Sequence, residues 1–167
     1  MSIADGGSGG DPLDLAQDLT SSFGKFFRID PLGSNSSNGQ YGIPSDNPFV
    51  DDDGALDEIY AYGLRNPQRF GWDPANGNLI VAEIGQNTIE EISLVPRGGN
   101  LGWNVWEGSF RYVGRNGVNA STPRADGSMT YPLVEWAYAD AAYGRQGRSR
   151  MRMLRNSAGA PSASRQR

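Results

Sequence analysis

The sequence contains no cysteine and no histidine. Without cysteine, the chain can form neither disulfides nor thiolate metal sites. Without histidine, it lacks the side chain that most often serves as a catalytic base near neutral pH. Long apolar runs are also missing, because none approaches the roughly 18 residues of a membrane-spanning helix. These absences leave carboxylates, arginines, amides and backbone carbonyls as the groups that could form a functional site.

Charge is distributed unevenly along the chain. All 19 acidic residues lie at or before Asp140, and only arginines carry charge after it. The first 140 residues therefore carry a net charge of −11, and the seven arginines of residues 141–167 carry +7. The acidic part is suited to binding cations. The basic tail has the composition of a disordered segment; a nucleic-acid-binding arm is an alternative, but we expect no nucleic-acid partner.

The chain is rich in turn-forming residues, with 23 glycines and 10 prolines among 167 residues. Short segments with strand-like patterns are separated by turn signals, which is typical of an all-β sandwich, barrel or propeller. The dipeptide Asn76-Gly77 predicts a hairpin, because both residues tolerate a positive φ. Residues 14–21 could form one helical turn. The strands are expected near residues 24–30, 57–64, 68–74, 78–84, 90–95 and 130–138, with a further short aromatic strand after a turn within residues 98–108.

Three short stretches carry candidate site residues. "DGGSGGDP" (5–12) matches no phosphate-binding motif and predicts a tight loop with several positive φ angles, with Asp5 a candidate site residue. In "EIGQNTIEE" (83–91), successive carbonyls and a glutamate could bind calcium, and a solvated polar hairpin is the alternative. In "LRNPQ" (64–68), Arg65 could hold an anionic ligand or pair with the acidic body. The four tryptophans are most simply explained as core residues.

The order of these stretches resembles a known family. "DGGSGGDP", "GKFFRIDP", "IPSDNPFV", "YAYGLRNPQRFGWD" and "GQNTIEEISLVPRGGNLGW" resemble the soluble pyrroloquinoline-quinone (PQQ) dependent sugar dehydrogenases, also called the glucose/sorbosone dehydrogenases. The resemblance extends from about residue 5 to residue 108, and more weakly to residue 138. It implies a six-bladed β-propeller that binds PQQ and calcium and oxidises an aldose to its lactone. Residues 1–140 would form about three blades of this propeller, and residues 141–167 an additional Arg-rich tail.

The resemblance also implies roles for individual residues. Arg65 and Asn66 correspond to residues that contact PQQ, and Gln68 at the same strand end is counted with them. The carbonyls of Gly85 and Gln86 correspond to ligands of the PQQ-bound calcium. Three further residues complete the expected site: Glu91 and the Leu101 carbonyl at a second, structural calcium, and Asp5 beside the catalytic histidine.

That histidine has no counterpart in this chain. In the family it is the general base and lies shortly before the glycine-rich turn. We therefore expect a fragment of a sugar dehydrogenase, inactive alone, or a non-catalytic propeller-derived module that binds calcium or another ligand. The tail resembles translation in a shifted reading frame, with a genuine basic arm as the alternative. The start of the chain shows no signal peptide, although the family implies a periplasmic or secreted protein and a homodimer of the full-length form.

Overall fold

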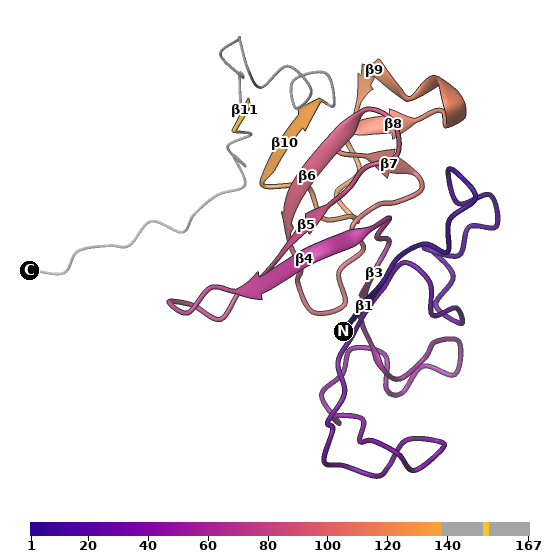
Figure 1. The fold of residues 1–167 in the computed structure, drawn as a ribbon, viewed down its shortest axis with the longest axis vertical. Helices are drawn as coiled ribbons and strands as arrows, with labels where there is room; N and C mark the ends of the chain where they lie inside the picture. Colours follow the sequence, from indigo (N-terminus) through magenta and orange to yellow (C-terminus); the bar gives the residue numbers. More distant parts are fainter. Residues whose placement is uncertain (138–151, 154–167) are drawn as a thin grey trace, which may run out of the picture.

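The computed structural model describes residues 1–137 and 152–153. Within them the protein is all-β, as predicted, and its strands form three antiparallel sheets (Figure 1). No helix of these residues is long and apolar enough to cross a membrane. The three sheets agree with the expected three blades of a partial propeller.

The first sheet has the order β1-β2-β3 and the second the order β11-β10-β6-β5-β4. The third sheet has the order β7-β8-β9 and includes a short 3₁₀ turn, η1, before β9. The strand bounds are β1 Ser2–Ile3, β2 Lys25–Phe27, β3 Ile59–Tyr62, β4 Pro67–Trp72, β5 Leu79–Glu83, β6 Ile89–Leu94, β7 Trp106–Glu107, β8 Phe110–Tyr112, β9 Val118–Pro123, β10 Val134–Ala137 and β11 Arg152–Met153, and η1 spans Gly114–Asn116.

Every strand expected from the sequence is present. Each is shorter than predicted except β6, which has the predicted length and begins one residue earlier. Strands β1, β8, β9 and β11 were not predicted, because they are short or lack regular alternation. Residues 14–21 form turns and no helix, since Asp11 and Asp14 supply turn hydrogen bonds to the following backbone instead. The prediction of a disordered or frame-shifted tail falls on residues outside the described ones, except β11, which pairs antiparallel with β10.

The hairpin between β4 and β5 is confirmed, but its turn differs from the two-residue type. Of the two turn residues Asn76 and Gly77, only Gly77 has a positive φ, of 74°. The loop is organised by Asp73, whose carboxylate accepts hydrogen bonds from Ala75 and Asn76 and whose carbonyl accepts one from Gly77. An Asp side chain that bonds the backbone two residues later is a common turn device.

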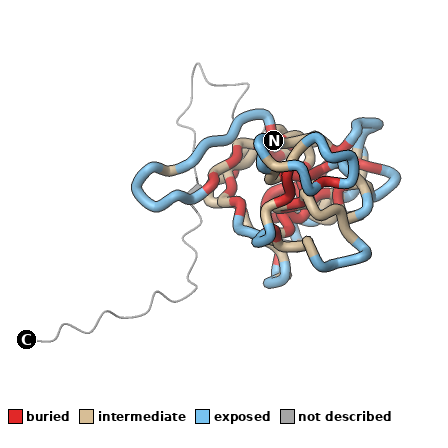
Figure 2. The backbone as a smooth tube through the Cα atoms, turned by 90° about the horizontal axis from the view of Figure 1, so that it is seen from below, coloured by how far each residue is buried: buried red, intermediate tan, exposed pale blue. Residues whose placement is uncertain are grey.

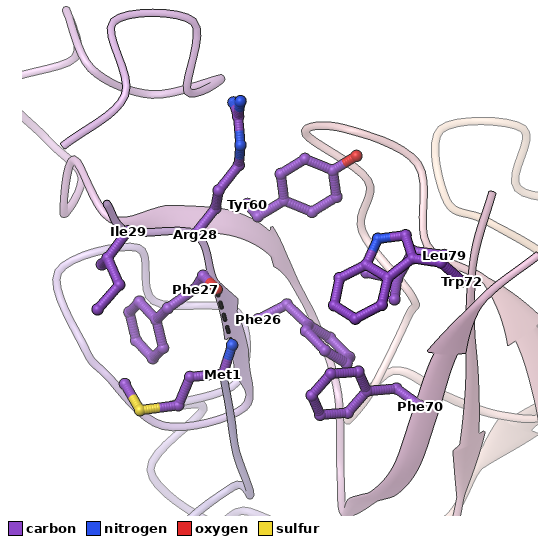
Figure 3. Close-up of a pocket in the computed structure, with 9 residues that line it drawn as sticks. All are labelled: Met1, Phe26, Phe27, Arg28, Ile29, Tyr60, Phe70, Trp72 and Leu79. Atoms are coloured by element: carbon purple, nitrogen blue, oxygen red, sulfur yellow. Dashed lines mark hydrogen bonds between the residues drawn. The ribbon is translucent and has the colours of Figure 1, made fainter. Parts of the chain in front are cut away.

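The hydrophobic core lies between the first and second sheets, where buried segments collect beneath exposed loops (Figure 2). Alternation along β3 and β5 turns Ile59, Ala61, Leu79 and Val81 inward. The rim of this junction is an apolar pocket of about 290 Å³, in which Phe26 and Phe70 meet edge to face with ring centroids 5.0 Å apart (Figure 3).

The tryptophans are only partly the core residues that we expected. Trp103 is buried, but Trp72 on β4 is 64% exposed and Trp106 and Trp136 are half-buried. Trp72 is exposed because β4 is the edge strand of its sheet and five of its six residues face solvent.

The junction between the second and third sheets is polar. Its buried residues include Glu83, Glu107, Ser109, Arg124 and Glu135. The two junctions of the molecule are therefore built from different chemistry, one apolar and one charged.

Candidate functional site

Arg65 lies between β3 and β4, and the structure fixes its position through three neighbours. Its Nε donates to Oε1 of Gln86 at 3.0 Å, and its Nη1 donates to the carbonyl of Ile84 at 2.9 Å. Its backbone N–H donates to Oε1 of Glu83 at 2.9 Å. The guanidinium is thereby tied to the end of β5. Among the residues that the structure describes, Arg65 forms no ion pair with a carboxylate.

The glycine-rich loop 5–10 covers this arginine. The backbone N–H of Asp5 donates to the carbonyl of Arg65 at 2.8 Å, and that of Gly10 donates to Gln86 Oε1 at 3.2 Å. Four glycines and Ser8 in this loop have positive φ, as the sequence predicted. The loop and the Arg65 segment together enclose a pocket of about 270 Å³ lined by Ile3, Ala4, Asp5, Gly6, Gly7, Phe23, Arg65 and Asn66.

The side chain of Asp5 is buried and holds the loop in place. Its Oδ1 accepts a hydrogen bond from the N–H of Gly7 at 3.0 Å. Its Oδ2 accepts one from Nε1 of Trp103 at 2.8 Å. Trp103 in turn packs against Tyr112, with ring centroids 4.7 Å apart, so Asp5 joins the loop to the third sheet.

The turn between β5 and β6 carries Gly85 and Gln86. A Cβ atom at Gly85 would lie 1.6 Å from the carbonyl oxygen of Ile89, so only glycine fits there. The turn is held by Glu107, whose Oε1 accepts hydrogen bonds from the N–H groups of Asn87, Thr88 and Ile89 at 2.8, 2.8 and 3.0 Å. One carboxylate oxygen therefore fixes the shape of the turn.

The structure brings together Asp5, Arg65, Asn66, Gly85 and Gln86 of the predicted site residues. Gln68 is exposed on β4 and is not among the residues that line the pocket beside Arg65. Leu101 is part of the hydrophobic core, and its N–H donates to the carbonyl of Tyr62 at 2.8 Å. Glu91 lies in the middle of β6, away from the pocket beside Arg65.

Glu91 belongs to a row of carboxylates that crosses the second sheet. It is paired with Glu83 on β5 and with Glu135 on β10. Burial, and then the charge of Glu91, raises the pKa of Glu83 well above its usual range. Burial likewise raises the pKa of Glu91 to about 7, although the nearby charge of Arg124 lowers it. Like charges in directly opposed positions are unfavourable. The raised pKa of Glu83, which shares a side-chain hydrogen bond with Glu91, relieves part of this repulsion.

Comparison with known proteins shows the family to which the chain belongs. The family model described as "Glucose / Sorbosone dehydrogenase" matches residues 1–148. The chain belongs to the glucose/sorbosone dehydrogenase family. The HIPL1 protein of Arabidopsis thaliana is 35% identical over 147 residues, which are 83% of this chain and 21% of that protein. The aldose sugar dehydrogenase YliI of Escherichia coli is 32% identical over 133 residues, covering 77% of this chain and 32% of that protein.

Solved structures of related sugar dehydrogenases share the fold. The soluble aldose sugar dehydrogenase of Escherichia coli, in its apo form, aligns with a TM-score of 0.62 and 27% identity, covering 81% of this chain and 35% of that one. The PQQ-bound aldose sugar dehydrogenase of Streptomyces coelicolor aligns with a TM-score of 0.55 and 28% identity, covering 80% and 30%. The chain spans about a third of the length of these two proteins.

Several residues that build the site were not singled out from the sequence. Glu83 could have been found, because a glutamate at the end of the apolar strand "LIVA" is unusual. Glu107, Arg124 and Glu135 give no local signal, since their positions depend on contacts between sheets. Trp103 was counted as a core residue, and its hydrogen bond to Asp5 spans 98 positions of sequence.

Proposed function

We propose that this chain carries part of the cofactor-binding face of a PQQ- and calcium-dependent aldose dehydrogenase. The observation that carries the proposal is the fixed guanidinium of Arg65, which lines a pocket with Asn66 and Asp5. Family membership and the PQQ-bound relative support it. The proposal includes the assignment of residues 1–140 to a partial propeller and of 141–167 to a separate tail.

The residues present fit PQQ, which is a tricarboxylate quinone. An arginine and an amide side chain suit a planar anion, and the loop 5–10 adds backbone close to the pocket. Arg65 and Asn66 would hold the cofactor, with Gln68 nearby on β4. The resemblance assigns the redox chemistry to bound PQQ, which accepts the two electrons taken from the sugar.

Calcium in this proposal would be held by the carbonyls of Gly85 and Gln86. Calcium takes oxygen ligands in flexible geometry, backbone carbonyls included. The turn that presents them is held rigid by Glu107 and by the bond between Arg65 and Gln86. The chain's own contribution is thus to fix two carbonyls beside the guanidinium of Arg65.

The second expected calcium, between Glu91 and the Leu101 carbonyl, fits this chain poorly. The guanidinium of Arg124 lies against Gly102, next to Leu101, and its charge acts on Glu91. No group of three or more Asp or Glu side chains in residues 1–137 is arranged to hold a metal ion. We therefore derive nothing from a calcium ion at that position.

Oxidation of an aldose to a lactone removes a proton from a hydroxyl group, and a base must take it. Both carboxylate oxygens of Asp5 already accept hydrogen bonds, from Gly7 and from Trp103. The sequence contains no histidine. We therefore propose that the chain binds the cofactor without turning over sugar by itself. Periplasmic or secreted location and homodimer formation are further predictions from the family for the whole protein.

The test is PQQ binding, measured by quenching of tryptophan fluorescence in the presence of calcium. Arg65→Ala should weaken binding at least about tenfold, since a charge-assisted hydrogen bond contributes about 1.5–3 kcal/mol. Arg69→Ala is the matched control, because Arg69 is an exposed arginine on β4. Equal binding by both variants would contradict the proposal. A dye-linked sugar oxidation assay on the same samples separates binding from turnover and so distinguishes a dehydrogenase from a non-catalytic binding module.

A further inference from the structure

The junction between the second and third sheets concentrates the buried polar atoms that have no hydrogen-bond partner. Among the described residues, these atoms include Oε2 of Glu107, Oγ of Ser109 and all three guanidinium nitrogens of Arg124. Leaving such groups unpaired is costly. Arg124 is the cation in this set, so its position determines how the surrounding carboxylates are compensated.

The backbone and side chain of Arg124 are held from several directions. Its N–H donates to the carbonyl of Ser109 at 2.7 Å, and its carbonyl accepts a hydrogen bond from the Tyr131 hydroxyl at 2.6 Å. The guanidinium carbon lies 4.5 Å from the centroid of the Tyr131 ring and 5.8 Å from that of Trp106. Only 6% of the residue is exposed, so these contacts fix a charge inside the protein.

The guanidinium lies against one part of the expected second calcium site, and its charge acts on the other. At Gly102, which follows Leu101, a Cβ atom would lie 3.0 Å from Nη1 and 3.2 Å from Nη2 of Arg124. The opposite charges of Arg124 and Glu91 act on each other. The charges of Asp126 and Glu135 also act on Arg124. Glu135 is itself a carboxylate, so it cannot balance the negative charge of Glu91. The site therefore already contains a positive charge that belongs to the chain.

We propose that Arg124 supplies the positive charge for the buried carboxylates around Glu91, so that this position needs no calcium ion in this protein. A guanidinium suits the role because it stays charged when buried and is weakly hydrated compared with an ammonium group. The absence of a side chain at Gly102 leaves room for it, and the rings of Trp106 and Tyr131 stabilise it. This inference concerns stability and is independent of whether the chain binds PQQ.

The test compares thermal unfolding of five proteins in EDTA and in millimolar calcium: the wild type, Arg124→Lys, Arg124→Gln, Glu91→Gln and the double variant Glu91→Gln/Arg124→Gln. We expect calcium to change the midpoints of the wild type and of Arg124→Lys by no more than it changes the midpoint of Glu91→Gln. Arg124→Gln should unfold at least about 5 °C lower in EDTA, because a buried carboxylate loses its partner. Glutamine offers an amide oxygen, which calcium accepts as a ligand, so calcium should restore much of the loss.

The double variant identifies charge as the cause. Removing the Glu91 charge should bring the midpoint of Arg124→Gln back toward the wild type in EDTA and abolish its response to calcium. The proposal is overturned if the double variant is as unstable as Arg124→Gln, since Arg124 would then act through packing alone. It is also overturned if calcium raises the midpoint of the wild type and Glu91→Gln removes that rise. A calcium response that survives Glu91→Gln comes from another site. The midpoints of Arg124→Gln and of the double variant in EDTA then test the proposal.

Discussion

The indole nitrogen of Trp103 donates a 2.8 Å hydrogen bond to the carboxylate of Asp5, across 98 positions of sequence. Both side chains are buried, at 4% and 6% exposure. The bond connects the loop that covers Arg65 to the segment that leads into the third sheet. It gives Asp5 a structural role in this chain, beside the role that the family resemblance implies for it.

Removing that carboxylate should loosen the loop. We expect Asp5→Ala to lower the free energy of unfolding by about 1–3 kcal/mol, because the Trp103 N–H would be left buried without an acceptor. Urea denaturation measures the change. Asp53→Ala, in the exposed acidic loop, is the control and should alter stability by less than about 0.5 kcal/mol; a similar loss in both would show that the hydrogen bond is not responsible.

Glu107 should control the turn that carries Gly85 and Gln86. Its Oε1 accepts three backbone hydrogen bonds. Glu107→Ala should therefore abolish protection of the Asn87, Thr88 and Ile89 amides in a hydrogen-exchange experiment, whereas Glu107→Gln retains an acceptor oxygen and should preserve part of it. Undiminished protection in Glu107→Ala would mean that the turn holds its shape without this carboxylate.

Gly85 should not tolerate any side chain. Because a Cβ atom would lie 1.6 Å from the Ile89 carbonyl oxygen, Gly85→Ala must displace the turn, and we expect a loss of about 3 kcal/mol or more. At Gly71 on β4, an added Cβ atom would meet no other atom within 4 Å, so Gly71→Ala is the matched control. Comparable unfolding midpoints in urea for the two variants would contradict the close approach at Gly85.

Lys25 should make stability rise with pH in the alkaline range. Its side chain is fully buried and donates to the carbonyls of Leu15, Ala16 and Phe23 at 2.8, 3.0 and 2.7 Å. Burial lowers its pKa from 10.5 to about 8. Between these values the unfolded chain holds a proton that the folded chain has released, so the free energy of unfolding increases with pH there.

The size of this effect can be measured by comparing pH 7 with pH 9.5. The contribution of Lys25 to the rise should be about 2 kcal/mol, and it should be missing in Lys25→Met, a variant of similar volume without the titrating group. Identical pH dependence in the two proteins would show that Lys25 is not the source. Below pH 8 the lysine is charged in both states, and its full burial cost is present.

The sequence predicts the local structure well where each residue acts on its neighbours. The glycine-rich loop, the β4–β5 hairpin and the positions of β2 to β6 and of β10 follow from residue order and turn chemistry. The bond between Asp5 and Trp103, and the placement of Arg124 beside Glu91, depend on how separate sheets meet, which local pattern does not encode. Local pattern also fails to place Gln68. It follows Arg65 closely in sequence but faces solvent, because β4 forms the edge of its sheet.

The contrast between the apolar and the charged junction has a consequence for how this chain can evolve. Apolar side chains such as Val81 and Leu79 can be exchanged one at a time for residues of similar volume at modest cost. The carboxylates and the guanidinium of the other junction depend on one another, so their substitution energies are not additive. Among homologues, positions 83, 91, 124 and 135 should therefore change in correlated sets, whereas the positions of the hydrophobic core should drift independently.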